Sequence, residues 1–141
     1  MREKTTALVA FFQSLTRESI QQMPRIYAAD ACFKDPFNEV RGIGDIQRIF
    51  LHMYDSALDP RFTVTGVYYG DDGVVLKWDF DFRMRSWRPA VPRRIHGVSH
   101  IRFNPDGLVT DHRDYWDAAE DLYEQLPVIG SAMRLFKKLA G

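Results

Sequence analysis

The residues best suited to chemistry lie in two short stretches far apart in the sequence. The first is "FKDPF", residues 33–37, in which Asp35 lies between two phenylalanines and directly before Pro36. A residue before proline is pushed to extended geometry, so Phe33, Asp35 and Phe37 are expected to face the same way. If they face inward, the apolar surroundings disfavour the charged carboxylate, which suits a general base. The alternative is that Asp35 accepts backbone hydrogen bonds in a surface turn and has no catalytic role.

The second stretch is "TDHRDYWD", residues 110–117, near the end of the chain. In a strand, His112, Asp114 and Trp116 alternate onto one face, and the first two have Cα atoms about 7 Å apart. Histidine titrates near neutrality, so it can give or take a proton. We expect the pair to contact a ligand or each other, with a structural polar pair at the strand's end as the alternative.

Helical patterns dominate the first third of the chain. Residues 5–16 place apolar side chains at helical spacing, which predicts a helix with one apolar stripe. Residues 17–28 predict a second helix, with Ile20, Met23 and Tyr27 on one face and a kink or restart at Pro24. Residues 44–57 predict a third helix with another apolar stripe. The two outer stripes consist of Leu8, Phe11, Phe12, Leu15, Ile46, Ile49, Phe50 and Met53.

After Pro60 the apolar pattern changes to a period of two residues, which is typical of strands. Strands are expected within residues 61–69, 74–87, 95–103 and 108–116, and a short one in residues 31–37. Alternation puts Trp78 on the apolar face of its strand and Ser99 on the same side as its apolar neighbours. His96 and His100 then face the polar side of the sheet.

Composition limits the classes of protein to consider. The chain has 141 residues, 45% of them hydrophobic and 13% aromatic, which suits one folded domain over residues 1–141. Nineteen basic residues balance nineteen acidic ones, so no general attraction to nucleic acid is expected. Cys32 is the only cysteine, and no spacing of histidines and carboxylates matches a specific metal motif. We therefore expect no metal and no cofactor.

The beginning of the chain lacks the features of a signal peptide, and no segment approaches the ~20 apolar residues of a membrane span. The cytoplasm is therefore the expected location. The last segment, residues 129–141, reads as a basic amphipathic helix that carries Arg134, Lys137 and Lys138. Such a helix can lie on an anionic membrane. We favour its packing on the protein itself.

Helices followed by long antiparallel strands predict an α+β fold. A curved meander sheet covered by the N-terminal helices leaves a cone with an apolar pocket, and the last segment adds a C-terminal helical extension. We expect the polar face of the sheet to pair with a second copy of the chain, giving a homodimer. That face would carry Asp79, Asp81, Arg83, His96 and His100.

Three stretches resemble the SnoaL-like, ketosteroid-isomerase-like branch of the nuclear-transport-factor-2-like superfamily. They are residues 26–50, "IRFNPDG" at 101–107, and "HRDYWD" at 112–117. The resemblance implies the same cone-shaped fold, and it makes Asp35 the counterpart of the isomerase's general base. The isomerase's two oxyanion donors fall on Phe11 and Ser99, which do not preserve them. The last strand also resembles limonene epoxide hydrolase, whose catalytic aspartate falls on Asp114.

These observations predict a pocket for a small apolar molecule with one or two polar groups. In an isomerase or hydrolase, Asp35 would be the base and His112 with Asp114 would orient the substrate or move a second proton. The alternative is a non-catalytic binding or accessory domain, with membrane association through the last helix as a further possibility. The other side chains expected at the ligand are Tyr27, Phe33, Trp78, Ser99 and Trp116.

Overall fold

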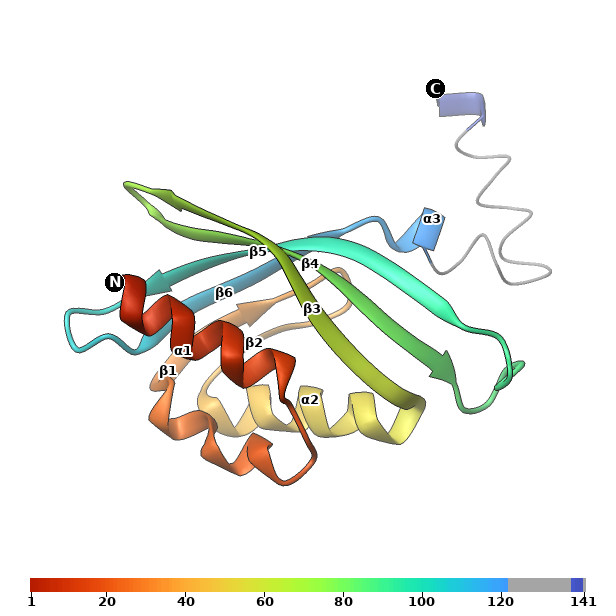
Figure 1. Ribbon diagram of the computed structural model, residues 1–141, viewed down its shortest axis with the longest axis horizontal. Helices are drawn as coiled ribbons and strands as arrows, with labels where there is room; N and C mark the ends of the chain where they lie inside the picture. Colours follow the sequence, from red (N-terminus) through yellow and green to blue (C-terminus); the bar gives the residue numbers. More distant parts are fainter. Residues whose placement is uncertain (122–137, 141) are drawn as a thin grey trace.

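The structure is a computed structural model, and it describes residues 1–121 and 138–140 (Figure 1). Five elements come first: helix α1 (Arg2–Gln13), the 3₁₀ helix η1 (Ser19–Arg25), strands β1 (Tyr27–Lys34) and β2 (Glu39–Arg41), and helix α2 (Ile43–Ser56). Four long strands and a short helix follow: β3 (Ala57–Gly70), β4 (Gly73–Met84), β5 (Arg93–Phe103), β6 (Val109–Trp116) and α3 (Ala118–Asp121).

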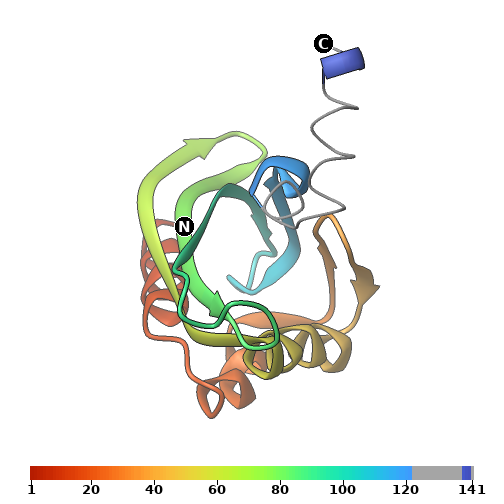
Figure 2. The same cartoon turned by 90° about the vertical axis from the view of Figure 1, so that its right-hand side faces the viewer.

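The strands form one six-stranded sheet in the order β2-β1-β6-β5-β4-β3. Strands β3 to β6 are antiparallel neighbours, whereas β1 runs parallel to β6 and joins the two ends of the fold. Figure 2 shows the sheet curling round a common interior, which α1, η1 and α2 cover on one side. The predicted α+β fold, with a curved meander sheet and N-terminal helices over it, is confirmed. Most of the predicted C-terminal helix falls on residues 122–137 and 141, which lie outside the described residues.

The two outer helices follow their apolar stripes. Leu8 and Phe12 of α1 are buried, as are Ile46 and Phe50 of α2. Gly42 caps α2 with a φ of 106°, a left-handed conformation that glycine adopts without strain. Both helices therefore turn aromatic side chains toward the concave face of the sheet.

The prediction of a single second helix over residues 17–28 is wrong. The segment forms the 3₁₀ helix η1, and Tyr27 begins β1 instead of ending a helix. A 3₁₀ helix repeats every three residues, so Ile20 and Met23 still share one buried face. Pro24 cannot donate a backbone hydrogen bond, which disfavours a continuous α-helix through this segment.

The strand pattern is confirmed most clearly in β4. Leu76, Trp78 and Phe80 are buried, and Lys77 between them is exposed. Strand β3 begins before Pro60 rather than after it, because the pairing with β4 shifts register between Leu58 and Arg61. This irregularity accommodates a residue that cannot donate to the ladder.

The convex face of the sheet carries charged side chains that pair along and across the strands. His96 Nδ1 lies 2.5 Å from Asp79 Oδ1, and Arg94 Nε lies 2.7 Å from Asp81 Oδ1. These pairs confirm that His96 faces away from the interior. Among the helices that the structure describes, none is long and apolar enough to cross a membrane.

Candidate functional site

A chain of hydrogen-bonded side chains crosses the concave face of the sheet from β4 to β1. Trp78 Nε1 donates to Ser99 Oγ over 2.8 Å, and Ser99 Oγ donates to Asp114 Oδ1 over 2.5 Å. His112 Nε2 lies 2.7 Å from the same oxygen of Asp114. The hydroxyl of Tyr27 lies 2.6 Å from His112 Nδ1 and completes the chain. We call these five residues the relay.

The register of the sheet brings the relay together. Ser99 pairs directly with Asp114 across β5 and β6, and Leu76 on β4 faces Ser99 from the other side. Trp78 lies opposite Gly97, whose missing side chain leaves room for the indole ring: a Cβ there would come within 2.5 Å of Trp78. The ring therefore lies across β5, and its N–H reaches Ser99.

The relay has one assignment of protons that satisfies every member. An ionised Asp114 only accepts hydrogen bonds, so Ser99 and His112 Nε2 both donate to it. His112 Nδ1 then accepts the proton of the Tyr27 hydroxyl. With a doubly protonated imidazole, the Tyr27 hydroxyl would need another acceptor, and no other hydrogen bond from Tyr27 occurs among the described residues. The geometry thus favours neutral His112 beside charged Asp114.

Burial holds the Tyr27 end of the relay in place. Tyr27 and His112 are buried, and the phenyl ring of Phe33 packs edge-on against the imidazole at 4.9 Å between ring centres. Burial of Tyr27 raises its pKa well above that of a free tyrosine, and the negative charge of Asp114 raises it further. The Tyr27 hydroxyl therefore keeps its proton and remains a hydrogen-bond donor to His112.

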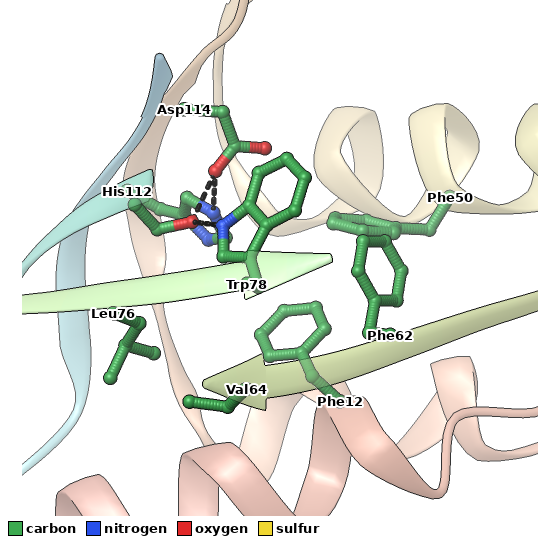
Figure 3. Close-up of a pocket in the computed structure, with 9 residues that line it drawn as sticks. Phe12, Phe50, Phe62, Val64, Leu76, Trp78, His112 and Asp114 are labelled. Carbon is green, nitrogen blue, oxygen red and sulfur yellow. Dashed lines mark hydrogen bonds and ion pairs between the residues drawn. The ribbon is translucent and has the colours of Figure 1, made fainter. Parts of the chain in front are cut away.

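An aromatic pocket lies beside the relay (Figure 3). Its lining residues come from helices α1 and α2 and from strands β3 to β6. Its cavity volume is about 30 Å³, enough for a few water molecules but far below the roughly 300–1,000 Å³ of typical ligand pockets. A substrate therefore enters only when lining side chains move. The lining residues are Phe12, Phe50, Phe62, Val64, Leu76, Trp78, Ser99, His112 and Asp114.

Asp114 lies between this pocket and the protein surface. Its side chain is 17% exposed, and it lines both the aromatic pocket and an outer groove along β1 and β6. Oδ1 accepts the two hydrogen bonds of the relay, whereas Oδ2 receives none from the described part of the chain. The carboxylate thus has one oxygen that is fixed and one that is open to a ligand.

Asp35 occupies a different setting. Its Oδ1 accepts hydrogen bonds from the backbone N–H groups of Phe37 and Asn38, at 2.8 and 2.6 Å. The Asn38 side-chain amide contacts both carboxylate oxygens, at 3.1 and 3.2 Å. Asp35 lines the outer groove together with Asp114 but is not among the residues of the aromatic pocket. The structure thus gives Asp35 the hydrogen bonds expected of a turn-stabilising aspartate.

The other residues expected at the ligand separate into two groups. Trp78 and Ser99 line the aromatic pocket, while Tyr27 and Phe33 lie behind it and support His112. Trp116 lines the outer groove and packs against Phe37, with 5.5 Å between ring centres. The expectation that Phe37 faces inward with Phe33 is wrong, because Pro36 begins a turn and leaves Phe37 52% exposed.

The fold and the site can now be compared with those of known proteins. Residues 8–112 match the family model of the SnoaL-like domain, which covers most of the chain. The chain belongs to the SnoaL-like domain family. The comparison with curated proteins found no match.

Solved structures agree with this SnoaL-like fold. One is a protein with a ketosteroid isomerase-like fold from Catenulispora acidiphila, in complex with trimethylamine (TM-score 0.71, 17% identity, 85% of this chain and 89% of that one). Another is an NTF2-like protein from Burkholderia pseudomallei (0.72, 14%, 85% and 95%). A third, from Shewanella denitrificans, is proposed to be a SnoaL-like polyketide cyclase (0.70, 18%, 89% and 100%). At these identities the likeness shows the fold alone.

Five residues of this SnoaL-like pocket were not among the expected site residues. Phe12 and Phe50 belong to helical stripes that the sequence does reveal, and Leu76 alternates with Trp78. Phe62 and Val64 share one face of β3, so the two-residue period could have found them. Sequence periodicity identifies the apolar face of an element, but it does not distinguish a packed wall from a pocket wall. The missed residues are Phe12, Phe50, Phe62, Val64 and Leu76.

The described residues contain no cluster of side chains suited to binding a metal ion. No group of three or more histidine, cysteine, aspartate or glutamate side chains in residues 1–121 and 138–140 gathers to hold an ion. His112 and Asp114 are the two ionisable residues of the pocket lining, and the relay uses both nitrogens of the histidine. The arrangement is instead suited to accepting a proton.

Proposed function

We propose that this SnoaL-like protein is an enzyme that removes a proton from a carbon atom of a small, largely apolar substrate. Asp114 is the general base. The observation that supports this most directly is the difference between its two oxygens. Oδ1 accepts hydrogen bonds from Ser99 and His112, whereas Oδ2 accepts none from the described residues, and the side chain lines the aromatic pocket. A base must be fixed in direction and still have a free lone pair, and this carboxylate meets both needs.

The rest of the relay supports the base without reacting with the substrate. Ser99 and His112 hold the carboxylate plane, and Trp78 and Tyr27 in turn orient those two residues. Aromatic walls limit water on the substrate's side, while Asp114 is partly exposed to the outer groove, so a proton taken up by Oδ2 can return to the substrate or exchange with solvent. The same oxygen can then return the proton to another atom of the substrate, which would give an isomerisation.

A base role for Asp35 stays a prediction with weaker geometric support. Its Oδ1 is committed to the backbone of the turn, and the side chain lies outside the aromatic pocket. Its place in the outer groove beside Asp114 suits contact with a substrate on the way in. We therefore assign the proton transfer to Asp114 and the turn to Asp35.

Deuterium exchange tests the proposal without knowledge of the natural substrate. Small ketones such as cyclohexanone and acetophenone would be incubated with the protein in D₂O near neutral pH, and loss of α-proton signals followed by NMR. We expect exchange above the buffer rate in the wild type and a loss of about 100-fold or more in Asp114→Asn, since general bases contribute about 10²–10⁴-fold.

The matched control is Asp106→Asn, which makes the same change at an exposed turn residue. Asp106→Asn should exchange at the wild-type rate. Equal exchange in wild type and Asp114→Asn would exclude Asp114 as the base. Melting curves of all three proteins show whether any lost exchange reflects lost folding.

Ligand binding without catalysis is the second candidate function, and the narrow cavity favours it. A pocket of about 30 Å³ whose hydrogen-bond donors are already engaged can serve as a packed binding site that opens for one ligand. The solved structure from Catenulispora acidiphila with bound trimethylamine supports small-molecule binding by this fold. Saturable binding of a small molecule with no exchange on any carbon acid would favour this second function.

We also propose that the convex face of the sheet forms a homodimer interface. Its charges pair within the chain, as in His96 with Asp79 and Arg94 with Asp81, so a second subunit would meet a nearly neutral surface. Sedimentation velocity at micromolar concentration tests this proposal. A single monomeric species over the whole concentration range would contradict it.

A further inference from the structure

The aromatic pocket carries an uncompensated negative charge. Its nine lining residues include neither lysine nor arginine, and His112 is neutral in the proton assignment that satisfies the relay. Within the described part of the chain, no lysine or arginine nitrogen lies within 4.0 Å of the Asp114 carboxylate. A charge in apolar surroundings is costly unless it is paired, so this pocket favours a ligand that brings a positive charge.

Among the described residues that line the pocket or support it, none offers a free hydrogen-bond donor. The indole N–H of Trp78 is used by Ser99, the hydroxyl of Ser99 by Asp114, and the Nε2 proton of His112 by Asp114. The hydroxyl of Tyr27 is used by His112. Enzymes that remove a proton next to a carbonyl group normally supply donors to the oxygen on which charge develops. Here the substrate itself must supply the stabilisation.

We propose that the substrate carries an alkylated, positively charged nitrogen as an iminium group next to the carbon that loses the proton. This inference rests on the proposed proton transfer to Asp114, and it names the chemical class of the substrate. The positive nitrogen makes the neighbouring C–H bond more acidic and compensates the charge of Asp114 before the reaction. It therefore replaces the donors that the pocket does not offer.

The charge balance of the step supports this class of substrate. The proton moves from carbon to Oδ2 of Asp114, the electron pair of the C–H bond forms a C=C bond to the iminium carbon, and the C=N π pair moves onto nitrogen and neutralises it. Before the step, the negative carboxylate faces a cation; after it, a neutral carboxylic acid faces a molecule with no net charge. A neutral ketone would instead become an enolate anion that only the newly protonated Asp114 could stabilise, so we expect its exchange to be slower than that of an iminium. The cationic substrate keeps the pocket neutral throughout.

Aromatic rings form the walls against which the alkyl groups of such a cation would pack. Phe62 stands nearly perpendicular to both Phe12 and Trp78, with interplanar angles of 74° and 86° and ring centres 5.9 Å apart in each case. Figure 3 shows these rings on adjacent sides of the pocket, with the Asp114 carboxylate near the indole. Ring faces attract cations within about 6 Å, most strongly where water is excluded.

Choline and 3,3-dimethylbutan-1-ol provide a direct test, because they have the same shape and differ in charge. Each would be titrated into the protein at low salt by calorimetry, and the methyl resonances of the ligand followed by NMR for the upfield shift that aromatic rings cause. We expect choline to bind at least tenfold more tightly than the neutral alcohol. Because both probes need the same opening of the pocket, the ratio of affinities is independent of that cost.

Two variants test whether the preference for choline over the neutral alcohol arises in this pocket. Asp114→Asn should lower choline affinity at least tenfold and change that of the neutral alcohol less than twofold. Phe62→Leu should reduce the preference for choline while keeping an apolar wall, and Asp106→Asn should match the wild type. Circular dichroism and melting curves show that each variant is folded.

Equal affinities for the two probes, tighter binding of the alcohol, or an undiminished choline preference in Asp114→Asn would each overturn the inference. The outcome is separable from that of the proposed function. Deuterium exchange on neutral ketones without a choline preference would keep the proton transfer and reject the cationic substrate. A choline preference without exchange on any carbon acid would do the reverse.

Discussion

Asp114 and Asp35 are both carboxylates that accept several hydrogen bonds, yet the two regions use them in opposite ways. On β6, Asp114 receives both of its hydrogen bonds at one oxygen and from side chains, so the other oxygen accepts none from the described residues. In the turn between β1 and β2, Asp35 receives hydrogen bonds from two backbone N–H groups and from the Asn38 amide at both oxygens.

The difference shows that aromatic neighbours in the sequence do not by themselves identify a carboxylate that lines an aromatic pocket. Two residues away on either side, Asp35 has two phenylalanines, whereas Asp114 has a histidine and a tryptophan. In the folded protein, it is Asp114 that lines an aromatic pocket. The atoms to which each oxygen is bound distinguish the two residues better than the sequence around them.

The largest effect expected from this comparison is on proton exchange. Asp114→Asn should lower the exchange rate by about 100-fold or more, while Asp35→Asn should stay within about threefold of the wild type. The reason is that only the first change removes a carboxylate from the lining of the aromatic pocket. A loss in Asp35→Asn as large as that in Asp114→Asn would restore Asp35 as the base.

The second effect concerns the stability that each carboxylate provides. Asp35→Ala removes the acceptor of two backbone N–H groups, so urea unfolding at neutral pH should show a loss of about 1–3 kcal/mol. Asp35→Asn should lose less, because an amide oxygen can still accept those hydrogen bonds. Asp106→Ala, at an exposed turn, is the control and should change stability by less than about 0.5 kcal/mol. An unchanged Asp35→Ala would mean that the turn does not depend on its carboxylate.

The third effect tests the far end of the relay. Tyr27→Phe leaves the buried His112 Nδ1 without its partner, and we expect a loss of about 1–2 kcal/mol near neutral pH. Nitrogen-15 NMR should show the Nε2-protonated tautomer of His112 in the wild type and a changed pattern in the variant. A purely packing role for Tyr27 would leave the His112 signals unchanged.

Alkaline pH adds a fourth test, which follows from the raised pKa of Tyr27. The unfolded chain loses this proton near pH 10, while the folded chain holds it to higher pH. The contribution of Tyr27 to stability is therefore fully present below pH 10 and declines as the pH rises further. Unfolding free energies at pH 8 and pH 11 should fall less in Tyr27→Phe than in the wild type. An identical decline in both proteins would contradict the assignment.

The smallest effect is expected on the convex face. Arg94→Ala removes an exposed ion pair with Asp81, and such pairs contribute little to stability because water and salt screen them. Its unfolding free energy should therefore change less than that of Asp35→Ala, and raising the salt concentration should reduce the difference further. A loss greater than that of Asp35→Ala would show that this face matters more than its exposure indicates.

Much of the fold could be predicted from the sequence, because periodicity reports directly on burial. The alternation through Trp78 and Phe80 and the stripe through Ile46 and Phe50 gave correct elements and correct faces. The second helix was misassigned because residues 20 and 23 suit a 3₁₀ helix as well as an α-helix. Strand β2 was missed because three residues are too few to establish a period.

The site was only partly predictable. The residue types at 112 and 114 and their spacing indicated a polar pair, and the structure places them 2.7 Å apart. The participation of Tyr27 depends on the parallel pairing of β1 with β6, for which local sequence carries no signal. The hydrogen bonds of Asp35 depend on where Pro36 turns the chain. Such long-range pairing and turn geometry are set by the whole fold.

The parallel pairing of β1 with β6 has a consequence for how the molecule is made. Tyr27 and His112 are 85 residues apart in the chain, so closing this contact requires the ordering of a long loop of polypeptide. Non-local contacts of this kind form slowly, because the chain loses the entropy of the long loop before the contact stabilises it. When a chain emerges from the ribosome, α1, the β1–β2 pair and α2 are synthesised long before β6. The site therefore cannot form in an early intermediate, because it requires β1 to pair with β6, the last strand of the sheet.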